Sequence, residues 1–196
     1  MKVLVGCEES QAVTVAFRKL GHEAYSCDIQ ECSGGHPEWH IQKDIVVVLK
    51  TYGIWDIVIL HPDCTAMALS GNRWYGVGKP SHQERIDAVE WTIDLWELAK
   101  KHSKKVVLEN PMSVIFQYLD TKVQYIQPWM FGHGEKKKTG LALYGVESLA
   151  PTNIVDGREE RIWKMPPSKN RKKLRSNTFP RIAEAMARQW GNLAID

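Results

Sequence analysis

Short apolar runs recur along the chain and alternate with longer amphipathic stretches. Runs rich in β-branched residues and bounded by polar ones are typical of strands that are buried on both faces of a sheet. They occupy Lys2–Gly6, Glu23–Cys27, Trp55–Leu60, Lys105–Leu108 and Thr139–Tyr144. A further run, Ile45–Leu49, fits either a strand or a short helix.

The stretches between these runs carry helix signals. Gln11–Leu20 has Ser10 as a candidate N-cap and Gly21 directly after its end. Ser81–Glu84 has the capping-box pattern that opens a long helix, and Thr178–Trp190 places apolar residues on one face. About six strands that alternate with helices predict an α/β fold, with a mostly parallel sheet and helices on both faces.

Composition places the chain among ordinary globular proteins. It has 196 residues, of which 43% are hydrophobic and 25% are charged, so we expect a single domain over residues 1–196. No apolar run approaches the roughly 18 residues that a membrane span needs. The chain opens on a strand pattern instead of a signal peptide, and four cysteines at irregular spacing do not suggest a disulfide framework. We therefore expect a cytoplasmic protein.

Charge is distributed unevenly, although the formal net charge is only +3. The stretch from Lys164 to Arg175 carries six cationic residues and no acid, and Lys136–Lys138 adds a second cluster. Clusters of this kind bind phosphate backbones, and they also occur as solvated loops. The sequence favours nucleic acid as the partner, with the loop interpretation left open.

The first strand–helix connection, Gly6–Ser10, lies where α/β proteins bind nucleotide-like cofactors. It holds a single glycine, so it does not match the dinucleotide fingerprint GxGxxG. Asp28 follows the second predicted strand, where an acid accepts hydrogen bonds from ribose hydroxyls. Asp28 fits a turn residue as well.

Two cysteines and two histidines, Cys27, Cys32, His36 and His40, fall close together in the sequence. Their spacing could suit a tetrahedral metal site, but it is looser than the usual C-x2-C and Cys27 falls at a strand end. We therefore predict no metal here.

Two further strand ends carry candidate chemistry. Pro62 stops the Trp55–Leu60 run, so Cys64 falls on the loop beyond it, and Glu109-Asn110 follows the Lys105–Leu108 run. Ligands bind outside the carboxyl ends of parallel strands, where a thiol can act as a nucleophile; a buried small hydrophobe is the alternative. A thiol that adds to C6 of a pyrimidine, with an acid at N3, turns C5 into a carbon nucleophile.

Taken in order, these pieces resemble the cytosine-5 DNA methyltransferase family. Pro62-Asp-Cys64 is similar to its Pro-Cys motif, and Val107–Pro111 to its Glu-Asn motif. The segment from Phe131 to Gly145 is similar to the family's Gln-x-Arg-x-Arg segment, and Arg175–Ala187 to its closing motif. The first strand and turn correspond to the motif that holds S-adenosylmethionine.

The resemblance implies a Rossmann-like, S-adenosylmethionine-dependent methyltransferase fold and methylation of cytosine C5 in DNA. Cys64 would be the nucleophile, Glu109 the proton donor to N3, and Asn110 the residue that braces the Pro-Cys loop. The residues that would contact the cofactor are Gly6, Glu8, Ser10, Asp28, Ile29, Asp44, His61, Pro62 and Asn177. The residues that would contact the nucleic acid are Arg73, Lys137, Thr139, Arg171 and Arg175. Ser70–Pro80, rich in glycine, is predicted as a mobile loop that closes over the site.

The chain also departs from the family. Asp63 replaces the proline before the cysteine, and a carboxylate beside a thiol disfavours the thiolate. Only about 30 residues, 145–174, stand where the family has its target-recognition domain, so we expect no separate domain of that kind. A partner protein that supplies target recognition is therefore a candidate. Compact chains of this kind suggest a bacteriophage source, and hence the host cytoplasm.

Other functions stay open on the sequence. A non-catalytic methyltransferase-like module that binds nucleic acid would fit Asp63 and the altered first turn. A methyltransferase of RNA or of a free nucleotide would fit the short recognition segment. An amino-group methyltransferase that uses Pro62-Asp63 is disfavoured, because no aromatic residue follows to stack the base.

Overall fold

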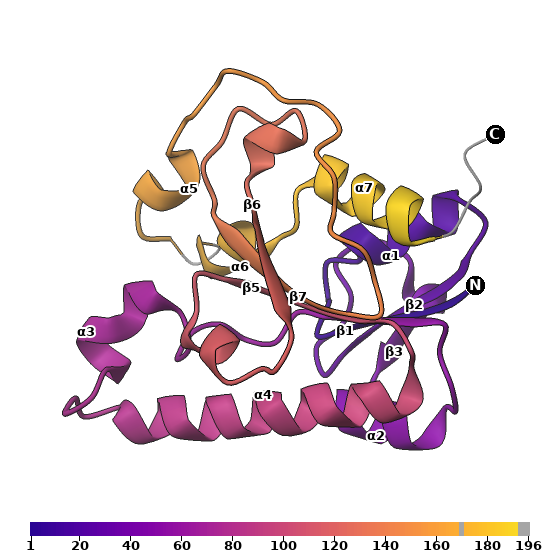
Figure 1. Ribbon diagram of the computed structural model, residues 1–196, viewed down its shortest axis with the longest axis horizontal. Coiled ribbons are helices and arrows are strands. Elements are labelled where there is room, and N and C mark those ends of the chain that lie inside the picture. The colour runs from indigo at the N-terminus through magenta and orange to yellow at the C-terminus, as the bar shows by residue number, and fades with distance from the viewer. Residues whose placement is uncertain (169–170, 192–196) are drawn as a thin grey trace.

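A seven-stranded sheet runs through the protein in the spatial order β3-β2-β1-β4-β5-β7-β6 (Figure 1). The computed structural model describes residues 1–168 and 171–191. The strands are β1 (Lys2–Gly6), β2 (Glu23–Asp28), β3 (His40–Gln42), β4 (Ile57–Leu60), β5 (Val106–Pro111), β6 (Lys122–Ile126) and β7 (Thr139–Tyr144). Strands β1 to β5 are parallel, whereas β7 is antiparallel to both β5 and β6.

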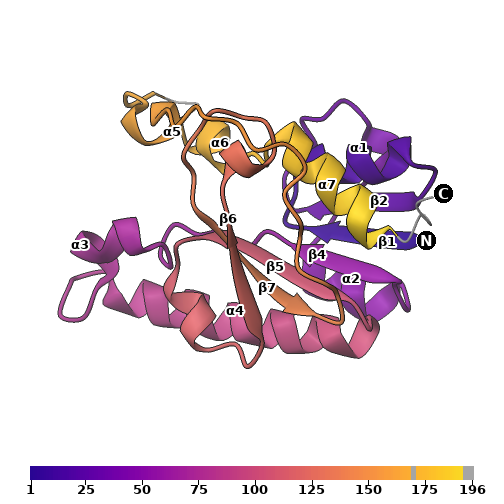
Figure 2. The ribbon, with the colours of Figure 1, turned by 45° about the horizontal axis from the view of Figure 1, so that its top comes forward.

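Helices cover both faces of this sheet, as the sequence predicted (Figure 2). Helices α1 and α7 cover one face, and α2 and α4 cover the other. The helices are α1 (Ala12–Lys19), α2 (Ile45–Thr51), α3 (Asn72–Tyr75), α4 (His82–His102), α5 (Arg161–Lys164), α6 (Arg171–Ser176) and α7 (Pro180–Trp190). Short 3-10 turns are η1 (Pro37–Trp39), η2 (Leu69–Gly71), η3 (Val114–Gln117) and η4 (Pro128–Met130). No helix in the described part of the chain is both long and apolar enough to cross a membrane.

Two-sided burial explains why the predicted strands are apolar throughout. On β1, Val3 and Val5 pack under α1 and α7, whereas Leu4 packs under α2 and α4. On β4, Ile59 and Leu60 divide between the two faces in the same way. Since successive side chains of a strand point to opposite faces, each position meets a core.

The predicted strands are confirmed, with three corrections. The sequence pattern missed β3 and β6, whereas Ile45–Leu49, which fitted either a strand or a short helix, belongs to helix α2. The expected end of the fifth strand at Leu108 is wrong, because β5 continues beside β7 with Glu109 opposite Leu141 and Asn110 opposite Gly140. Both polar residues therefore lie within the sheet. Pairing of β5 with β7 fixes their positions more firmly than a loop would.

The helix starts also differ from the prediction. Helix α1 begins after Gln11, and it is the buried Glu8 carboxylate, not Ser10, that accepts hydrogen bonds from the Val13 and Thr14 amides at 2.6 and 3.3 Å. Helix α4 begins where expected, but the Ser81 side chain accepts no capping hydrogen bond among the described residues. Local sequence located both helices, while the actual cap of α1 comes from the preceding turn.

We predict that Gly145, at the end of β7, is essential for stability. Its φ of +66° disfavours any side chain, and an added Cβ would lie 1.9 Å from the Lys104 carbonyl oxygen. Gly145→Ala should lower the free energy of unfolding in urea by about 2–5 kcal/mol, from backbone strain together with the clash.

Gly53 provides the matched control, because its φ is +83° and nothing lies within 4 Å of an added Cβ. Gly53→Ala should cost only the strain, about 1–2 kcal/mol. Equal losses for the two variants would show that the close approach to Lys104 has no energetic weight.

Candidate active site

Three carboxylates from different segments surround the carboxyl end of β1. Burial raises the pKa of the Cys7 thiol, and the negative charges of Asp28, Asp44 and Asp63 raise it further. Asp28 ends β2, Asp44 directly precedes α2 and Asp63 lies on the loop after β4, so the topology brings these acids to the carboxyl ends of the parallel strands. That edge is where ligands bind in open α/β folds.

The predicted cofactor residues at this edge have individual structural settings. An added Cβ on Gly6 would lie 2.7 Å from Ile45 Cδ1, so glycine is needed for α2 to approach β1. Asp28 is half-buried and accepts a hydrogen bond from the Gln30 amide at 2.9 Å, and Asp44 caps α2 by accepting from Val46 N at 2.7 Å. Ile29 is 71% exposed at the end of β2, an unusual position for an apolar side chain.

The first strand–helix turn keeps its shape without a glycine-rich sequence. Cys7 and Gln11 both take φ of 59°, in the left-handed region that glycine usually fills. The buried Gln11 amide donates to the His36 carbonyl oxygen at 2.8 Å and accepts from the His36 amide at 3.0 Å. An added Cβ on Gly34 would lie 2.5 Å from Gln11 Cβ, so the loop after β2 lies directly against the turn.

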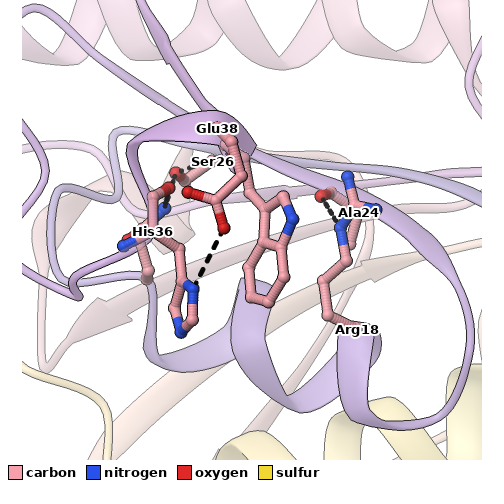
Figure 3. A network of polar contacts seen from close by, with 7 residues as sticks. Arg18, Ala24, Ser26, His36 and Glu38 are labelled. Carbon is pink, nitrogen blue, oxygen red and sulfur yellow. Dashed lines mark hydrogen bonds and ion pairs between the residues drawn. The ribbon is translucent and has the colours of Figure 1, made fainter.

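The Cys27–His40 group holds this loop in place and does not converge on one point. Cys27 donates to the Lys43 carbonyl oxygen at 3.2 Å, and His40 Nδ1 lies 2.8 Å from Ser26 Oγ. His36 stacks on Trp39 with ring centroids 3.9 Å apart, and Glu38 contacts His36 at 3.2 Å (Figure 3). No group of three or more His, Cys, Asp or Glu within residues 1–168 and 171–191 is placed to hold a metal ion.

Strand register places the second set of predicted residues side by side. Leu60 of β4 pairs with Leu108 of β5, so the next residues, His61 and Glu109, are neighbours. His61 Nδ1 lies 3.5 Å from Glu109 Oε2, and each side chain is 12% exposed. One residue further, Asn110 Nδ2 donates to the buried Pro62 carbonyl oxygen at 2.9 Å, which ties the Cys64 loop to β5.

Cys64 is half-buried within electrostatic reach of Glu109 and Lys137. Burial raises the pKa of the Cys64 thiol, the charges of Asp63 and Glu109 raise it further, and Lys137 opposes them. Burial and the charge of Arg175 lower the pKa of Lys137 in turn, although Glu109 and Cys64 act against this. The thiol, the carboxylate and the amine therefore each shift the pKa of another group in this site.

A narrow pocket lies between Glu109, Lys137 and the C-terminal segment. It is lined by Glu109, Ile126, Lys137, Thr139, Thr178, Phe179, Ile182 and Met186. Lys137 Nζ donates to the carbonyl oxygens of Asn177 at 3.1 Å and Ser176 at 3.4 Å. Asn177 therefore lies beside Lys137, and Thr139 is buried in the pocket wall with its hydroxyl donating to Lys137 O.

Arg85 is the residue that sequence reasoning missed. It is 8% exposed on α4, and its guanidinium donates to the Ala66 and Ala68 carbonyl oxygens and to Asn72 Oδ1 at 2.7, 3.2 and 2.8 Å. Arg85 therefore fastens the segment after Cys64 to α4. The predicted mobile loop, Ser70–Pro80, is partly helical, because α3 and most of η2 fall within it. An arginine on an amphipathic helix gives no sequence signal for such a role.

Of the predicted nucleic-acid residues, Arg73 lies on α3, and Arg171 and Arg175 lie on α6. Arg73 is exposed over the ring of Trp74, which is itself 58% exposed. Arg171 donates to the Met165 carbonyl oxygen at 2.8 Å, and Arg175 lies close enough to Lys137 to lower its pKa. The basic stretch that contains them includes residues 169–170, which lie outside the described residues.

Comparison with known proteins identifies the fold. No protein-family model matches the sequence, and no curated protein matches it. A crystal structure described as a DNA modification methyltransferase encoded within an E. coli prophage matches with a TM-score of 0.50 and 10% identity, over 79% of this chain and 52% of that chain. The Dnmt2 methyltransferase of S. pombe gives a TM-score of 0.46 and 10% identity, over 84% and 53%.

The chain thus spans about half the length of both solved structures. At this identity the prophage protein supports the fold alone. The sheet order, the reversed β7 and this likeness establish the Rossmann-like α/β methyltransferase fold that the sequence predicted.

We predict that Asp63→Asn speeds alkylation of Cys64. The substitution removes a negative charge that raises the pKa of the thiol, so the thiolate fraction at pH 7 increases. The amide oxygen of asparagine can still accept the hydrogen bond that the Thr65 amide donates to Asp63 Oδ1 at 2.9 Å. Peptide mass spectrometry after iodoacetamide treatment should show a several-fold faster rate at Cys64, with Asp94→Asn on α4 as the control; an unchanged rate would contradict the electrostatic role.

We predict that Arg85→Met destabilises the protein by about 2–4 kcal/mol, because it removes the guanidinium donor of the Ala66 carbonyl oxygen and of Asn72 Oδ1, while the Ala68 carbonyl oxygen keeps the Gly71 amide. Urea unfolding measures the loss, and limited proteolysis should cut more readily within residues 66–79. Arg73→Met, at an exposed position, should change stability by no more than about 0.5 kcal/mol. A stable Arg85→Met variant with unchanged proteolysis would exclude the fastening role.

Proposed function

We propose that this chain is an S-adenosylmethionine-dependent cytosine C5-methyltransferase that acts on DNA through a covalent adduct at Cys64. The observation that carries the proposal is the closeness of Cys64, on the loop after β4, to Glu109 on the neighbouring strand β5. Asn110 braces the thiol loop through the Pro62 carbonyl oxygen. This chemistry requires a nucleophile and a proton donor on one pyrimidine ring.

The edge beside this pair fits the cofactor. S-adenosylmethionine carries a sulfonium and an ammonium group, and the carboxylates of Asp28, Asp44 and Asp63 give the end of β1 a negative potential. Asp28 would accept a hydrogen bond from the ribose, and the exposed side chain of Ile29 would pack against the adenine. When bound, the cofactor supplies an electrophilic methyl group. Glu8 is omitted from this set, because both of its oxygens accept from α1.

Residues of the chain then activate C5 of the cytosine as a nucleophile. The Cys64 thiolate forms the bond to C6, and the electron pair of the C5–C6 double bond shifts toward N3, where Glu109 delivers a proton. Lys137 opposes the negative charges of Glu109 and Cys64 from the other side of the pocket. Loss of the C5 proton after methylation releases Cys64 and restores the aromatic ring.

The proposal of DNA as substrate rests on charge. A base inside a duplex cannot reach Cys64, so it must leave the stack before it meets Cys64 and Glu109. Arg73, Arg171 and Arg175 would supply positive charge to the phosphate backbone. The prophage protein of similar fold is described as a DNA modification enzyme, which agrees with this choice.

A second candidate function is a binding module of the same fold without catalysis. The raised pKa of Cys64, caused by burial and by Asp63, favours it, because a protonated thiol is a poor nucleophile. Both candidates require the cofactor edge and the basic surface. They differ in whether a bond to Cys64 ever forms.

The deciding experiment is intact-mass analysis after incubation with S-adenosylmethionine and an oligonucleotide that contains 5-fluorocytosine. Because fluorine at C5 cannot leave as a proton, the enzyme should stall as a covalent adduct. We expect the adduct with the natural chain, its loss in Cys64→Ser, and its retention in the control Cys32→Ser. Cofactor binding without an adduct on duplex DNA, single-stranded DNA, RNA or free nucleotide would favour the binding module.

A further inference from the structure

His61 holds a buried position that the proposed reaction has not yet used. It directly follows β4, and its Nδ1 faces Glu109 Oε2 at 3.5 Å. Its Nε2 is buried and meets no hydrogen-bond partner within residues 1–168 and 171–191. The partner of the His61 imidazole is therefore Glu109, the carboxyl group that protonates N3 of cytosine in the proposed function.

Charged groups face His61 from three other elements. Glu109 comes from β5, Glu8 from the turn after β1, and Lys137 from the segment before β7. Burial and Lys137 lower the pKa of His61, but the hydrogen bond and charge of Glu109, with the charge of Glu8, outweigh them and raise it. The imidazole therefore keeps its proton at a higher pH than a free histidine would.

Glu109 shows the opposite behaviour. Burial raises the pKa of Glu109, but the hydrogen bond and charge of His61, with the charge of Lys137, outweigh burial and hold it below its usual value. At neutral pH Glu109 is thus a carboxylate, which has no proton to give to N3. The proposed step needs a proton from a neighbour, and exchange with solvent is restricted because the side chain is only 12% exposed.

We propose that His61 supplies the proton that Glu109 delivers to N3 of cytosine, and that it takes the proton back when Cys64 leaves. His61 Nδ1–H first passes its proton to the Glu109 carboxylate, which becomes a carboxylic acid. As Sγ bonds to C6 and the π electrons move to N3, Glu109 gives this proton to N3 and returns to the carboxylate. The thiolate and the imidazolium are consumed together, and the base stays neutral. Once C5 has taken up its new substituent, N3 returns its proton through Glu109 to His61, and Cys64 leaves as a thiolate when C5 loses a proton to solvent.

This inference rests on the proposed function, and it makes His61 a positioning residue that acts through Glu109. Lys137 is less suited to supply the proton, because its Nζ already donates to two backbone carbonyl oxygens. Glu8 cannot do so, because its carboxylate accepts from the start of α1. His61 is thus the group that both contacts Glu109 and carries an acidic proton.

The test compares His61→Asn with His61→Phe in exchange of the cytosine C5 hydrogen for deuterium, measured on a DNA oligonucleotide without methyl donor. The asparagine amide can replace Nδ1–H as a donor to Glu109 but cannot ionise. We expect the natural chain to exchange up to a pH above the ordinary histidine range and then to slow as His61 loses its proton. Both variants should be about 100-fold slower at pH 7.

A purely structural role gives a different result, since His61→Asn would then keep the natural rate and pH profile while His61→Phe would not. That outcome overturns the inference and leaves the proposed function standing. The absence of exchange and of 5-fluorocytosine adduct in the natural chain would instead end both.

A second measurement needs no activity. Imidazole NMR of the free protein, with the His61 signal assigned by its loss in His61→Asn, should give a His61 pKa above the ordinary value. The pKa should fall in Glu109→Gln, which keeps the size of the side chain but removes its charge. A pKa at or below the ordinary value in the natural chain would exclude His61 as the proton source.

Discussion

The parallel register of β4 and β5 is the constraint on which the site depends. With Leu60 opposite Leu108, each residue that follows on one strand meets its counterpart on the other: His61 meets Glu109, and Pro62 meets Asn110. Because β7 continues the pairing of β5 on the other side, Glu109 and Asn110 are held by the sheet itself. A slip of one residue would turn both side chains to the opposite face.

Around this register the site balances charge of both signs. Five acids, Glu8, Asp28, Asp44, Asp63 and Glu109, lie around the carboxyl ends of the strands. His61 acts on Glu8 and Glu109, and Lys137 acts on Glu109. The acidic side suits a cationic methyl donor, but it also disfavours the thiolate beside it. The opposed pKa changes of His61 and Glu109 belong to this balance.

Sequence reasoning reached the features that follow from local pattern. Doubly buried strands are apolar, so their positions were visible, and parallel strands share an edge, so Cys64 and Glu109 could be expected together. It missed Arg85, the cap by Glu8 and the clamp by Gln11, because the partners of these side chains are distant in sequence or belong to backbone groups. It missed β3 because that strand is three residues long and polar at both ends.

The amide of Gln11 contacts the backbone of His36 as a neighbouring strand would, with one donor and one acceptor. Such complementarity is directional. A glutamate differs from glutamine only in its terminal group, yet it would set an anion against the His36 carbonyl oxygen in a buried place. In a glycine-rich motif the flexible backbone of glycine allows this turn, whereas here the hydrogen bonds of the Gln11 amide hold it. A search for glycines therefore overlooks the turn, while a search for a buried amide would find it.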